Sequence, residues 1–181
     1  MRKIPTLYAR TEDRRYVIDQ VTPGCEWVLA GEGVATRKYD GTCVMWDGTQ
    51  WWARREVKPG RPTPEGFVLS DVDETTGKIV GWEPAGQTGF WKYLAEAAAS
   101  LPPADVGTYE LCGPKINGNP EQFEEHALVE HAHTEVLRAS PRQFDELHGY
   151  LASSPWEGIV WHHPDGRMAK LKKRDFPAAR P

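Results

Sequence analysis

The sequence contains no long hydrophobic run, and this absence excludes an ordinary membrane-spanning helix. None of its apolar stretches approaches the roughly 18 residues that such a helix needs, and the mean hydropathy is −0.61. The start of the chain, MRKIPTLYARTEDRR, has basic residues but lacks the apolar segment that follows them in a secretory signal. We therefore expect neither a membrane partner nor a secretory signal.

Cysteine is scarce as well, with three residues in a chain of 181. The three are Cys25, Cys43 and Cys112, and none forms a Cys-x-x-Cys pair. An odd number without that spacing predicts neither a disulfide framework nor a zinc ribbon. A reducing compartment is the simplest interpretation, so we expect a cytoplasmic location.

Positive charge is in deficit overall, because 22 Lys and Arg face 26 Asp and Glu for a net charge of −4. This balance argues against a general nucleic-acid coat, whose affinity comes from neutralising many phosphates. The deficit is uneven, since residues 165–181 hold six basic and two acidic side chains, a local charge of +4. The sequence therefore predicts a cationic edge near the end of an acidic chain.

The residues that are abundant predict one α+β domain that spans residues 1–181. Hydrophobic residues make up 39% of the chain and include eight Trp, which is enough apolar surface to offset the ordering entropy of a core. Short apolar stretches separated by Pro and Gly are typical of strands. One hairpin is predicted over 43–53, with Asp47 and Gly48 as its turn.

Helices are predicted in two places. Residues 90–99 are strong helix formers, and Pro102-Pro103 ends that run. A second helix is expected from Ser140 to about Leu151, because the sequence after Ser140 supplies an N-cap, an early Pro and a capping-box Gln. Residues 121–137 fit a helix or a strand, with 126–129 favouring a strand. The polar stretch 58–78 is expected to be a long surface loop or lid.

The most informative stretch places Lys38 two residues before Asp40 and Gly41. A lysine amine becomes a nucleophile when nearby cations or desolvation favour its neutral form. Gly41 lets a backbone approach closely, and Asp40 can orient a ribose, a metal or the lysine. Taken alone, this four-residue pattern also fits a solvated lysine in a turn.

A second group of charged residues lies in a predicted C-terminal hairpin, with strands over 156–161 and 167–172. A turn of two or four residues would place Glu157 on the same face as Lys170 and Lys172, whereas a three-residue turn would place them on opposite faces. The first arrangement sets a carboxylate suited to Mg²⁺ beside two lysines suited to phosphate. The alternative is a surface hairpin whose charges face water.

A third segment, 108–114, predicts an amphipathic strand. Its alternation sends Tyr109 and Leu111 to one face and Glu110 to the other. Glu110 is then available to bind a ribose hydroxyl or a metal. The same alternation also fits an ordinary strand with one wet face.

In order along the chain, these segments resemble the motifs of the covalent nucleotidyltransferases, the family of DNA ligases, RNA ligases and mRNA capping enzymes. The closer resemblance is to vertebrate-type ATP-dependent 5′-to-3′ RNA ligases and covers residues from about 34 to 176. The wider resemblance is carried by Lys38-Tyr39-Asp40-Gly41, the Arg54 region, Tyr109-Glu110-Leu111-Cys112-Gly113, Glu157-Gly158-Ile159-Val160 and Lys170-Leu171-Lys172. The closer one is carried by Lys38-Tyr39-Asp40-Gly41-Thr42-Cys43, Trp52-Ala53-Arg54, Gly81-Trp82-Glu83-Pro84, Ile116-Asn117-Gly118-Asn119-Pro120 and Glu157-Gly158-Ile159-Val160-Trp161-His162.

The resemblance implies an adenylation domain of two packed, mainly antiparallel sheets flanked by helices. It also implies a three-step reaction. Lys38 would take AMP from ATP, pass it to a 5′-phosphate on RNA, and a 3′-hydroxyl would then displace AMP to seal the strand. The implied cofactors are ATP and Mg²⁺ or Mn²⁺. RNA with 5′-phosphate and 3′-hydroxyl ends is the implied partner, and a monomer is expected.

The resemblance also implies a role for each site residue. The implied catalytic residues are Lys38, Asp40, Lys170 and Lys172. Nucleotide binding would use Thr36, Lys38, Arg54, Glu110, Glu157, Lys170 and Lys172. Glu110 would bind the ribose, Glu157 would assist the metal together with Glu110, and Lys170 and Lys172 would hold the α-phosphate. How adenine is recognised stays open.

Two features depart from the family pattern. With an Asp47-Gly48 turn, alternation places Arg55 on the face of Lys38 and Asp40, whereas the family match favours Arg54. We predict that Arg54 is the site residue. Only eight residues follow Lys173, so no OB domain is expected after the last motif. This makes a DNA ligase or a GTP-using capping enzyme the weaker alternative, and a non-catalytic nucleotide- or RNA-binding module is a third.

Overall fold

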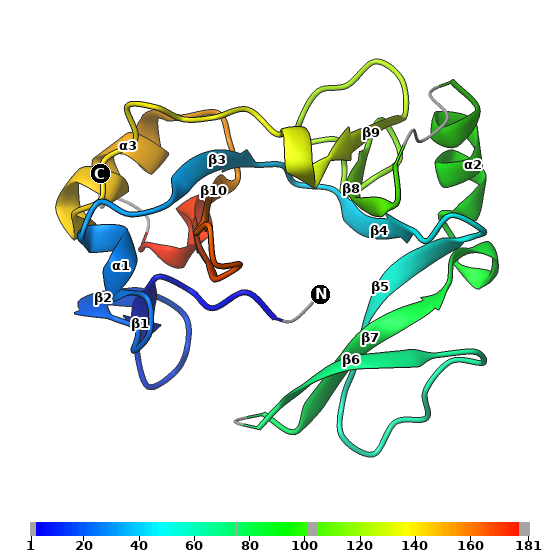
Figure 1. Ribbon diagram of the computed structural model, residues 1–181, viewed down its shortest axis with the longest axis horizontal. Coiled ribbons are helices and arrows are strands. Elements are labelled where there is room, and N and C mark those ends of the chain that lie inside the picture. Colours follow the sequence, from blue (N-terminus) through cyan, green and yellow to red (C-terminus); the bar gives the residue numbers. More distant parts are fainter. Residues whose placement is uncertain (1–2, 75, 101–104, 178–181) are drawn as a thin grey trace. The chain divides into compact units, whose positions relative to one another are not determined.

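The structure is a computed structural model that describes residues 3–74, 76–100 and 105–177 (Figure 1). The described chain divides into two compact units. The six-stranded unit contains Lys3 and Asp40–His133, and the three-stranded unit contains Ile4–Tyr39 and the described part of Thr134–Pro181. The chain therefore passes from one unit to the other between Tyr39 and Asp40, inside the Lys-x-Asp-Gly motif. The expectation of one functional domain over 1–181 stays a prediction.

The six-stranded unit is built on one sheet with the order β6-β7-β5-β4-β8-β9, in which all neighbours are antiparallel. Its strands are β4 (Thr42–Trp46), β5 (Trp51–Val57), β6 (Val68–Asp73), β7 (Lys78–Pro84), β8 (Gly107–Cys112) and β9 (Ala127–Glu130). Its helical elements are η1 (Ala85–Gln87), α2 (Trp91–Ser100) and η2 (His131–His133).

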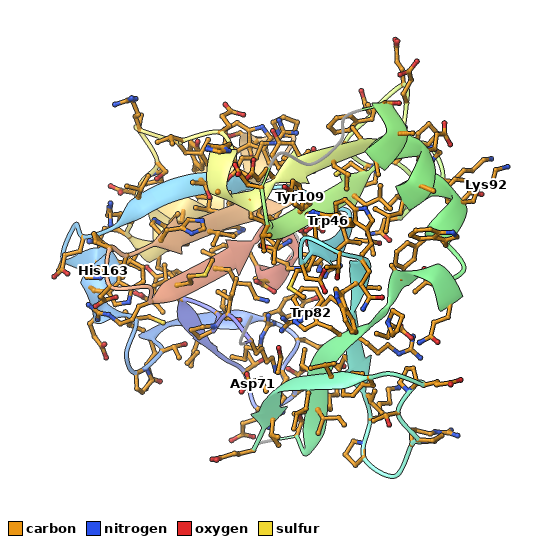
Figure 2. All side chains as sticks on the ribbon, turned by 45° about the vertical axis from the view of Figure 1, so that its right-hand side comes forward. Trp46, Asp71, Trp82, Lys92, Tyr109 and His163 are labelled. Carbon is orange, nitrogen blue, oxygen red and sulfur yellow. The ribbon has the colours of Figure 1, made fainter. Side chains whose placement is uncertain are left out.

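Helix α2 supplies part of the core of this unit. Its buried residues Leu94 and Ala97 pack with the side chains on one face of the sheet, which include Val44 and Tyr109. Figure 2 shows Lys92 on the outer side of the helix, away from Tyr109. Because the core occupies only one face of the central strands, alternation sends Glu110 and Arg54 to the other face.

The three-stranded unit is built on the sheet β11-β10-β3 and a separate pair, β1-β2. Its strands are β1 (Tyr8–Arg10), β2 (Val17–Val21), β3 (Val34–Lys38), β10 (Gly158–His162) and β11 (Met168–Lys172). Its helical elements are α1 (Glu26–Leu29), α3 (Phe144–Ser153) and η3 (Lys173–Asp175). The sheet is extended by single bridges, parallel from Thr6 to Lys170 and antiparallel from Thr36 to Val136.

The core of the three-stranded unit covers one face of this sheet. Ile159, Trp161 and Leu171 point into it and are completely buried, as are Leu147 and Leu151 of α3. Figure 1 shows β3 and β10 side by side in this unit. The alternate residues of β3, β10 and β11 therefore point away from the core, and the candidate site lies on that opposite face.

The architecture confirms the expectation of a mixed α/β chain with mainly antiparallel sheets and few helices. The predicted helix over 90–99 is α2, and the strand favoured at 126–129 is β9. The prolines Pro102-Pro103 lie outside the described residues. No helix in the described ranges is both long enough and apolar enough to cross a membrane.

Three local predictions are wrong. The stretch 58–78 is not one long loop, because the alternating residues Val68–Asp73 form the edge strand β6. The hairpin turn is shifted by one residue, because Asp47 closes it with Gln50 and its carboxylate accepts hydrogen bonds from Thr49, Gln50 and Trp52. Two of those bonds come from the backbone, so the side chain of Asp47 fixes the turn after itself.

The third wrong prediction concerns the start of the second helix. Helix α3 begins at Phe144 and not just after Ser140. The guanidinium of Arg142 donates to the backbone carbonyls of Val28, Glu32 and Gly33, while the Arg142 carbonyl accepts a bond from the Tyr8 hydroxyl at 3.0 Å. These tertiary bonds hold the segment outside the helix and override its local capping signal.

Candidate functional site

Four predicted site residues share one face of the three-stranded sheet. Gly158 of β10 pairs with Lys38 on one side and with Lys172 on the other. One step along, Val160 pairs with Thr36 and with Lys170. Directly paired residues point to the same side of a sheet, so the face opposite the core carries three lysines around a strand that has no charged residue of its own.

Gly158 leaves the space between Lys38 and Lys172 without a side chain. A Cβ built at this position would lie 2.2 Å from the carbonyl oxygen of Leu171 and 2.8 Å from the Cα of Lys172. No residue other than glycine fits at such a distance without moving the backbone. The close approach of β10 and β11 therefore requires the glycine that follows Glu157.

Glu157 joins two of the lysines. Its Oε2 lies 2.5 Å from Nζ of Lys38, and its Oε1 lies 2.5 Å from Nζ of Lys172. The side chain of Glu157 is 7% exposed and those of the two lysines 19% and 17%, whereas Arg174, whose guanidinium is 3.7 Å from Oε1, is 72% exposed. The two lysine pairs are thus largely withdrawn from water, and Arg174 adds charge from the surface.

The electrostatics of Glu157 follow from this geometry. Burial alone would raise the pKa of its carboxyl group, but the ammonium charges of Lys38 and Lys172 and the hydrogen bonds from them hold the pKa below its ordinary value. Glu157 is therefore an ionised carboxylate at neutral pH. It neutralises part of the positive charge that gathers on this face.

The turn before β11 has three residues, which is the case in which strand alternation separates Glu157 from the lysines. His163 pairs with Arg167 by a backbone bond of 2.9 Å around Pro164-Asp165-Gly166, and the register runs on to Gly158 and Lys172. Glu157 nevertheless reaches Lys172 because it precedes the first residue of β10 and is not bound by the alternation. The sequence left the turn length open. The structure has the three-residue turn and still brings the carboxylate of Glu157 to Lys172.

Lys170 is the lysine of this face for which no ion pair within 4 Å is described. Burial, followed by the charges of Lys172 and Lys38, lowers the pKa of Lys170 to about 8, against smaller opposite effects of Asp175 and Glu157. A pKa near 8 leaves the amine mostly protonated at pH 7 but poorly compensated. An anion placed on this face would relieve that cost.

Thr36 is also on this face but is turned inward. It is 8% exposed, its hydroxyl donates to the Val160 carbonyl at 3.2 Å, and it lies 3.0 Å from Nε2 of His162. These contacts fix the strand pair β3-β10. The predicted nucleotide contact of Thr36 stays a prediction.

The remaining predicted residues belong to the six-stranded unit, where Glu110 is held in place by two contacts. Its Oε1 accepts the backbone N–H of Gly41 at 3.1 Å, and its Oε2 lies 3.0 Å from Nε2 of His131. The side chain is 10% exposed. A buried carboxylate that is already hydrogen-bonded suits a hydroxyl donor, because each oxygen keeps a further lone pair.

A loop that follows β8 fixes the Asp40-Gly41 backbone. The amide of Asn117 donates to Oδ1 of Asp40 at 3.1 Å and to the carbonyl oxygen of Gly41 at 2.7 Å. The backbone N–H of Asp40 donates to Oε1 of Glu121 at 2.8 Å. A Cβ on Gly41 would lie 2.3 Å from the Leu111 carbonyl, so glycine is required for this packing.

Arg54, and not Arg55, lies on the face of Glu110. The paired residues Val44 and Ala53 point into the core, so Arg54, next along β5, points to the opposite side. Its guanidinium carbon is 5.5 Å from the centre of the Trp82 ring, which Figure 2 labels, and burial lowers the pKa of Arg54. Arg55 is exposed, with a loose ion pair of 3.7 Å to Glu83. The face argument from Lys38 failed because the chain leaves β3 before Asp40, so alternation is not continuous into β4.

The predicted site residues thus fall into two groups. Thr36, Lys38, Glu157, Lys170 and Lys172 come together in the three-stranded unit, and Asp40, Arg54 and Glu110 belong to the six-stranded unit. His131 and Glu121 also contact this second group, and the sequence does not indicate either contact. Both contacts join residues far apart in the chain, and no local pattern marks them.

Within the described ranges, no group of three or more His, Cys, Asp or Glu side chains is arranged to hold a metal ion. Magnesium that travels with phosphates usually needs only one or two protein carboxylates. No protein-family model matches this chain, and no curated protein matches it either.

Proposed function

We propose that this chain is a nucleotidyltransferase adenylation domain that acts as an ATP-dependent RNA ligase through a lysyl-AMP intermediate. The observation that carries the proposal is the position of Lys38. Its amine lies 2.5 Å from the Glu157 carboxylate, on a sheet face shared with Lys170 and Lys172. This places a candidate nucleophile and two cations that could hold phosphate on one sheet face, beside a carboxylate that could accept a proton.

In the proposed first step the Lys38 amine attacks the α-phosphorus of ATP. A nitrogen–phosphorus bond forms, the bond from the α-phosphorus to the β-phosphate oxygen breaks, and pyrophosphate leaves. The ammonium of Lys38 must lose one proton before the attack, and its nitrogen loses a second as the bond to phosphorus forms. Oε2 of Glu157, 2.5 Å from Nζ, could accept one of these protons, and water would take the other. AMP is then held on Lys38 as a phosphoramidate.

Lys170 and Lys172 would stabilise the charge on the α-phosphate. A fixed ammonium near a developing charge contributes most where water is excluded, and both lysines are partly buried. The low pKa of Lys170 supports this role, because a phosphate would supply the negative charge that its surroundings lack. In the absence of ATP, Glu157 supplies part of that charge to Lys38 and Lys172.

The six-stranded unit would supply the nucleotide contacts. Glu110 would accept a ribose hydroxyl, and Arg54 and Asp40 would support the nucleotide or the 5′-phosphate end. Glu110 fits this role better than that of a metal ligand, because one of its oxygens already holds a backbone N–H and the other faces His131. The predicted metal contact of Glu110 is therefore the weaker of its two assignments.

Glu157 is the residue that fits a magnesium ion best, since it is the ionised carboxylate of the lysine face. Both of its oxygens already contact lysines, so the ion would have to arrive together with the negative phosphates. When bound, Mg²⁺ would neutralise charge on the phosphates.

After adenylylation, the ligase proposal requires two more transfers. AMP would move from Lys38 to an RNA 5′-phosphate, and an RNA 3′-hydroxyl would then displace it. The neighbouring cationic residues Lys172, Lys173 and Arg174 suit engagement of a strand end better than coating of a duplex.

The proposal is tested by covalent labelling with ATP that carries the label on the α- or the γ-phosphate, in the presence of Mg²⁺. We expect label from the α-phosphate only, its loss in Lys38→Ala, and its retention in Lys92→Ala, a matched change at an exposed lysine. An unlabelled wild type, or label that persists in Lys38→Ala, contradicts the proposal. Competition with GTP, followed by sealing assays on RNA and DNA ends, separates an RNA ligase from the capping and DNA ligase alternatives.

A further inference from the structure

His131 contacts the side chains of Glu110 and Thr108 at once. Its Nε2 lies 3.0 Å from Oε2 of Glu110, and its Nδ1 lies 2.9 Å from the hydroxyl oxygen of Thr108. A carboxylate can only accept, so Nε2 must carry the proton that is shared with Glu110. In the neutral ring Nδ1 then accepts from the Thr108 hydroxyl, which fixes both the tautomer and the plane of the ring.

This contact completes the fixation of Glu110. Gly41 holds one carboxylate oxygen and His131 holds the other. With both oxygens held, the carboxylate has one orientation, and the remaining lone pairs point in fixed directions. Without His131, one oxygen would be free to turn or to be hydrated.

The same helical turn provides a comparison. His133, two residues further along η2, also contacts a glutamate, with its Nδ1 2.7 Å from Oε2 of Glu130. That pair lies at the surface, where the His133 side chain is 75% exposed, whereas the side chains of His131 and Glu110 are 28% and 10% exposed. The two histidines therefore make the same kind of contact, but only His131 makes it with a predicted nucleotide residue.

We propose that His131 is a positioning residue that orients Glu110 toward a ribose hydroxyl and thereby sets the preference for ribonucleotides over deoxyribonucleotides. This inference rests on the proposed function, because it takes Glu110 as the ribose contact. A site built to hydrogen-bond a hydroxyl discriminates against the analogue that lacks it, since its polar group is then left without a partner. The discrimination depends on the carboxylate being held in place.

The test compares the rate of adenylylation at limiting nucleotide with ATP, 2′-deoxy-ATP and 3′-deoxy-ATP. We expect wild type to react at least about tenfold faster with ATP than with one of the two deoxy analogues, the equivalent of one hydrogen bond of about 1.4 kcal/mol. His131→Ala should lose most of that ratio by slowing with ATP and not with the sensitive analogue. His131→Gln, which keeps an N–H donor, should restore part of the ratio, and His133→Ala should behave as wild type.

The possible failures are distinguishable. If His131→Ala and His131→Gln slow all three nucleotides equally, or leave the ratio unchanged, the positioning role is overturned while the proposed function stands. If wild type discriminates against neither analogue, the ribose contact of Glu110 is overturned together with the inference. If wild type takes no label from any of the three, the proposed function itself fails.

Discussion

Two lysines on one strand face should respond to the same substitution with opposite changes in stability. Lys170→Met should stabilise the protein at pH 7, because Lys170 is buried beside two other cations. Lys172→Met should destabilise it, because Lys172 lies 2.5 Å from the Glu157 carboxylate. The two positions are separated by one residue of β11 and point to the same side, so strand propensity and methionine packing are matched.

The magnitude follows from the pKa of Lys170. A fall from 10.5 to about 8 corresponds to about 3 kcal/mol at about 1.4 kcal/mol per pKa unit. Water reaches part of the side chain, so we expect Lys170→Met to gain roughly 1–2 kcal/mol in free energy of unfolding. Lys172→Met should cost about 1–2 kcal/mol, which is less than the cost of an unpaired buried charge, because Lys38 still contacts Glu157.

The dependence of this stability difference on pH shows whether the charge of Lys170 causes it. Below about pH 8 Lys170 is protonated in both folded and unfolded chains, and the folded state carries the whole cost of the charge. Between about 8 and 10.5 the folded state loses the proton first, so its stability rises, and above 10.5 the cost has gone. The advantage of Lys170→Met should therefore be full at pH 7 and should shrink by about pH 10.

Urea unfolding of wild type and both variants at these two pH values measures the effect. A Lys170→Met variant that is as destabilised as Lys172→Met at pH 7 would refute the reasoning. An advantage that is unchanged near pH 10 would show that it comes from methionine packing and not from the charge.

The other predictions concern Gly158, Asn117 and Glu157. Gly158→Ala should lower the free energy of unfolding by more than about 3 kcal/mol, because the new Cβ meets a backbone carbonyl. Gly149→Ala on α3, where the space is open, should raise the free energy of unfolding by about 0.5–1 kcal/mol. Similar melting temperatures for the two variants would contradict this prediction. Asn117→Asp keeps a residue type that tolerates the φ of 49° at this position but removes the hydrogen bonds that Asn117 donates to Asp40 and Gly41. Adenylylation should therefore slow by about tenfold. An unchanged rate would show that these two bonds are not needed for the reaction. Glu157→Gln should be less stable than wild type at pH 7, because folding holds the pKa of the Glu157 carboxyl group below 4.5. The difference in free energy of unfolding between the two proteins, measured with urea, should narrow as the pH falls below that value.

Strand alternation predicted the lysine face well. Lys170 and Lys172 are two residues apart in a short strand, and such residues point to one side whatever the register. The helix over 90–99 was equally predictable, because its residues favour a helix and its buried positions recur at helical spacing.

Turn geometry and tertiary hydrogen bonds determine the features that could not be predicted from the sequence. The side of the hairpin on which Glu157 lies depended on the length of the turn before β11, which the sequence left open, and Glu157 itself lies just outside β10. Helix α3 starts late because Arg142 bonds to carbonyls more than 100 residues earlier in the chain. The contact of His131 with Glu110 spans 21 residues and depends on how β9 and η2 follow β8, which no local signal reveals.

The most direct test of the central assignment is to locate the adduct. Wild-type protein incubated with ATP and Mg²⁺ is digested, and its peptides are analysed by mass spectrometry under conditions that preserve phosphoramidates. We expect one AMP group, attached to Lys38, that is absent from Lys38→Ala and is released when pyrophosphate is added. AMP on any other residue, or a folded protein that carries none, would contradict the account.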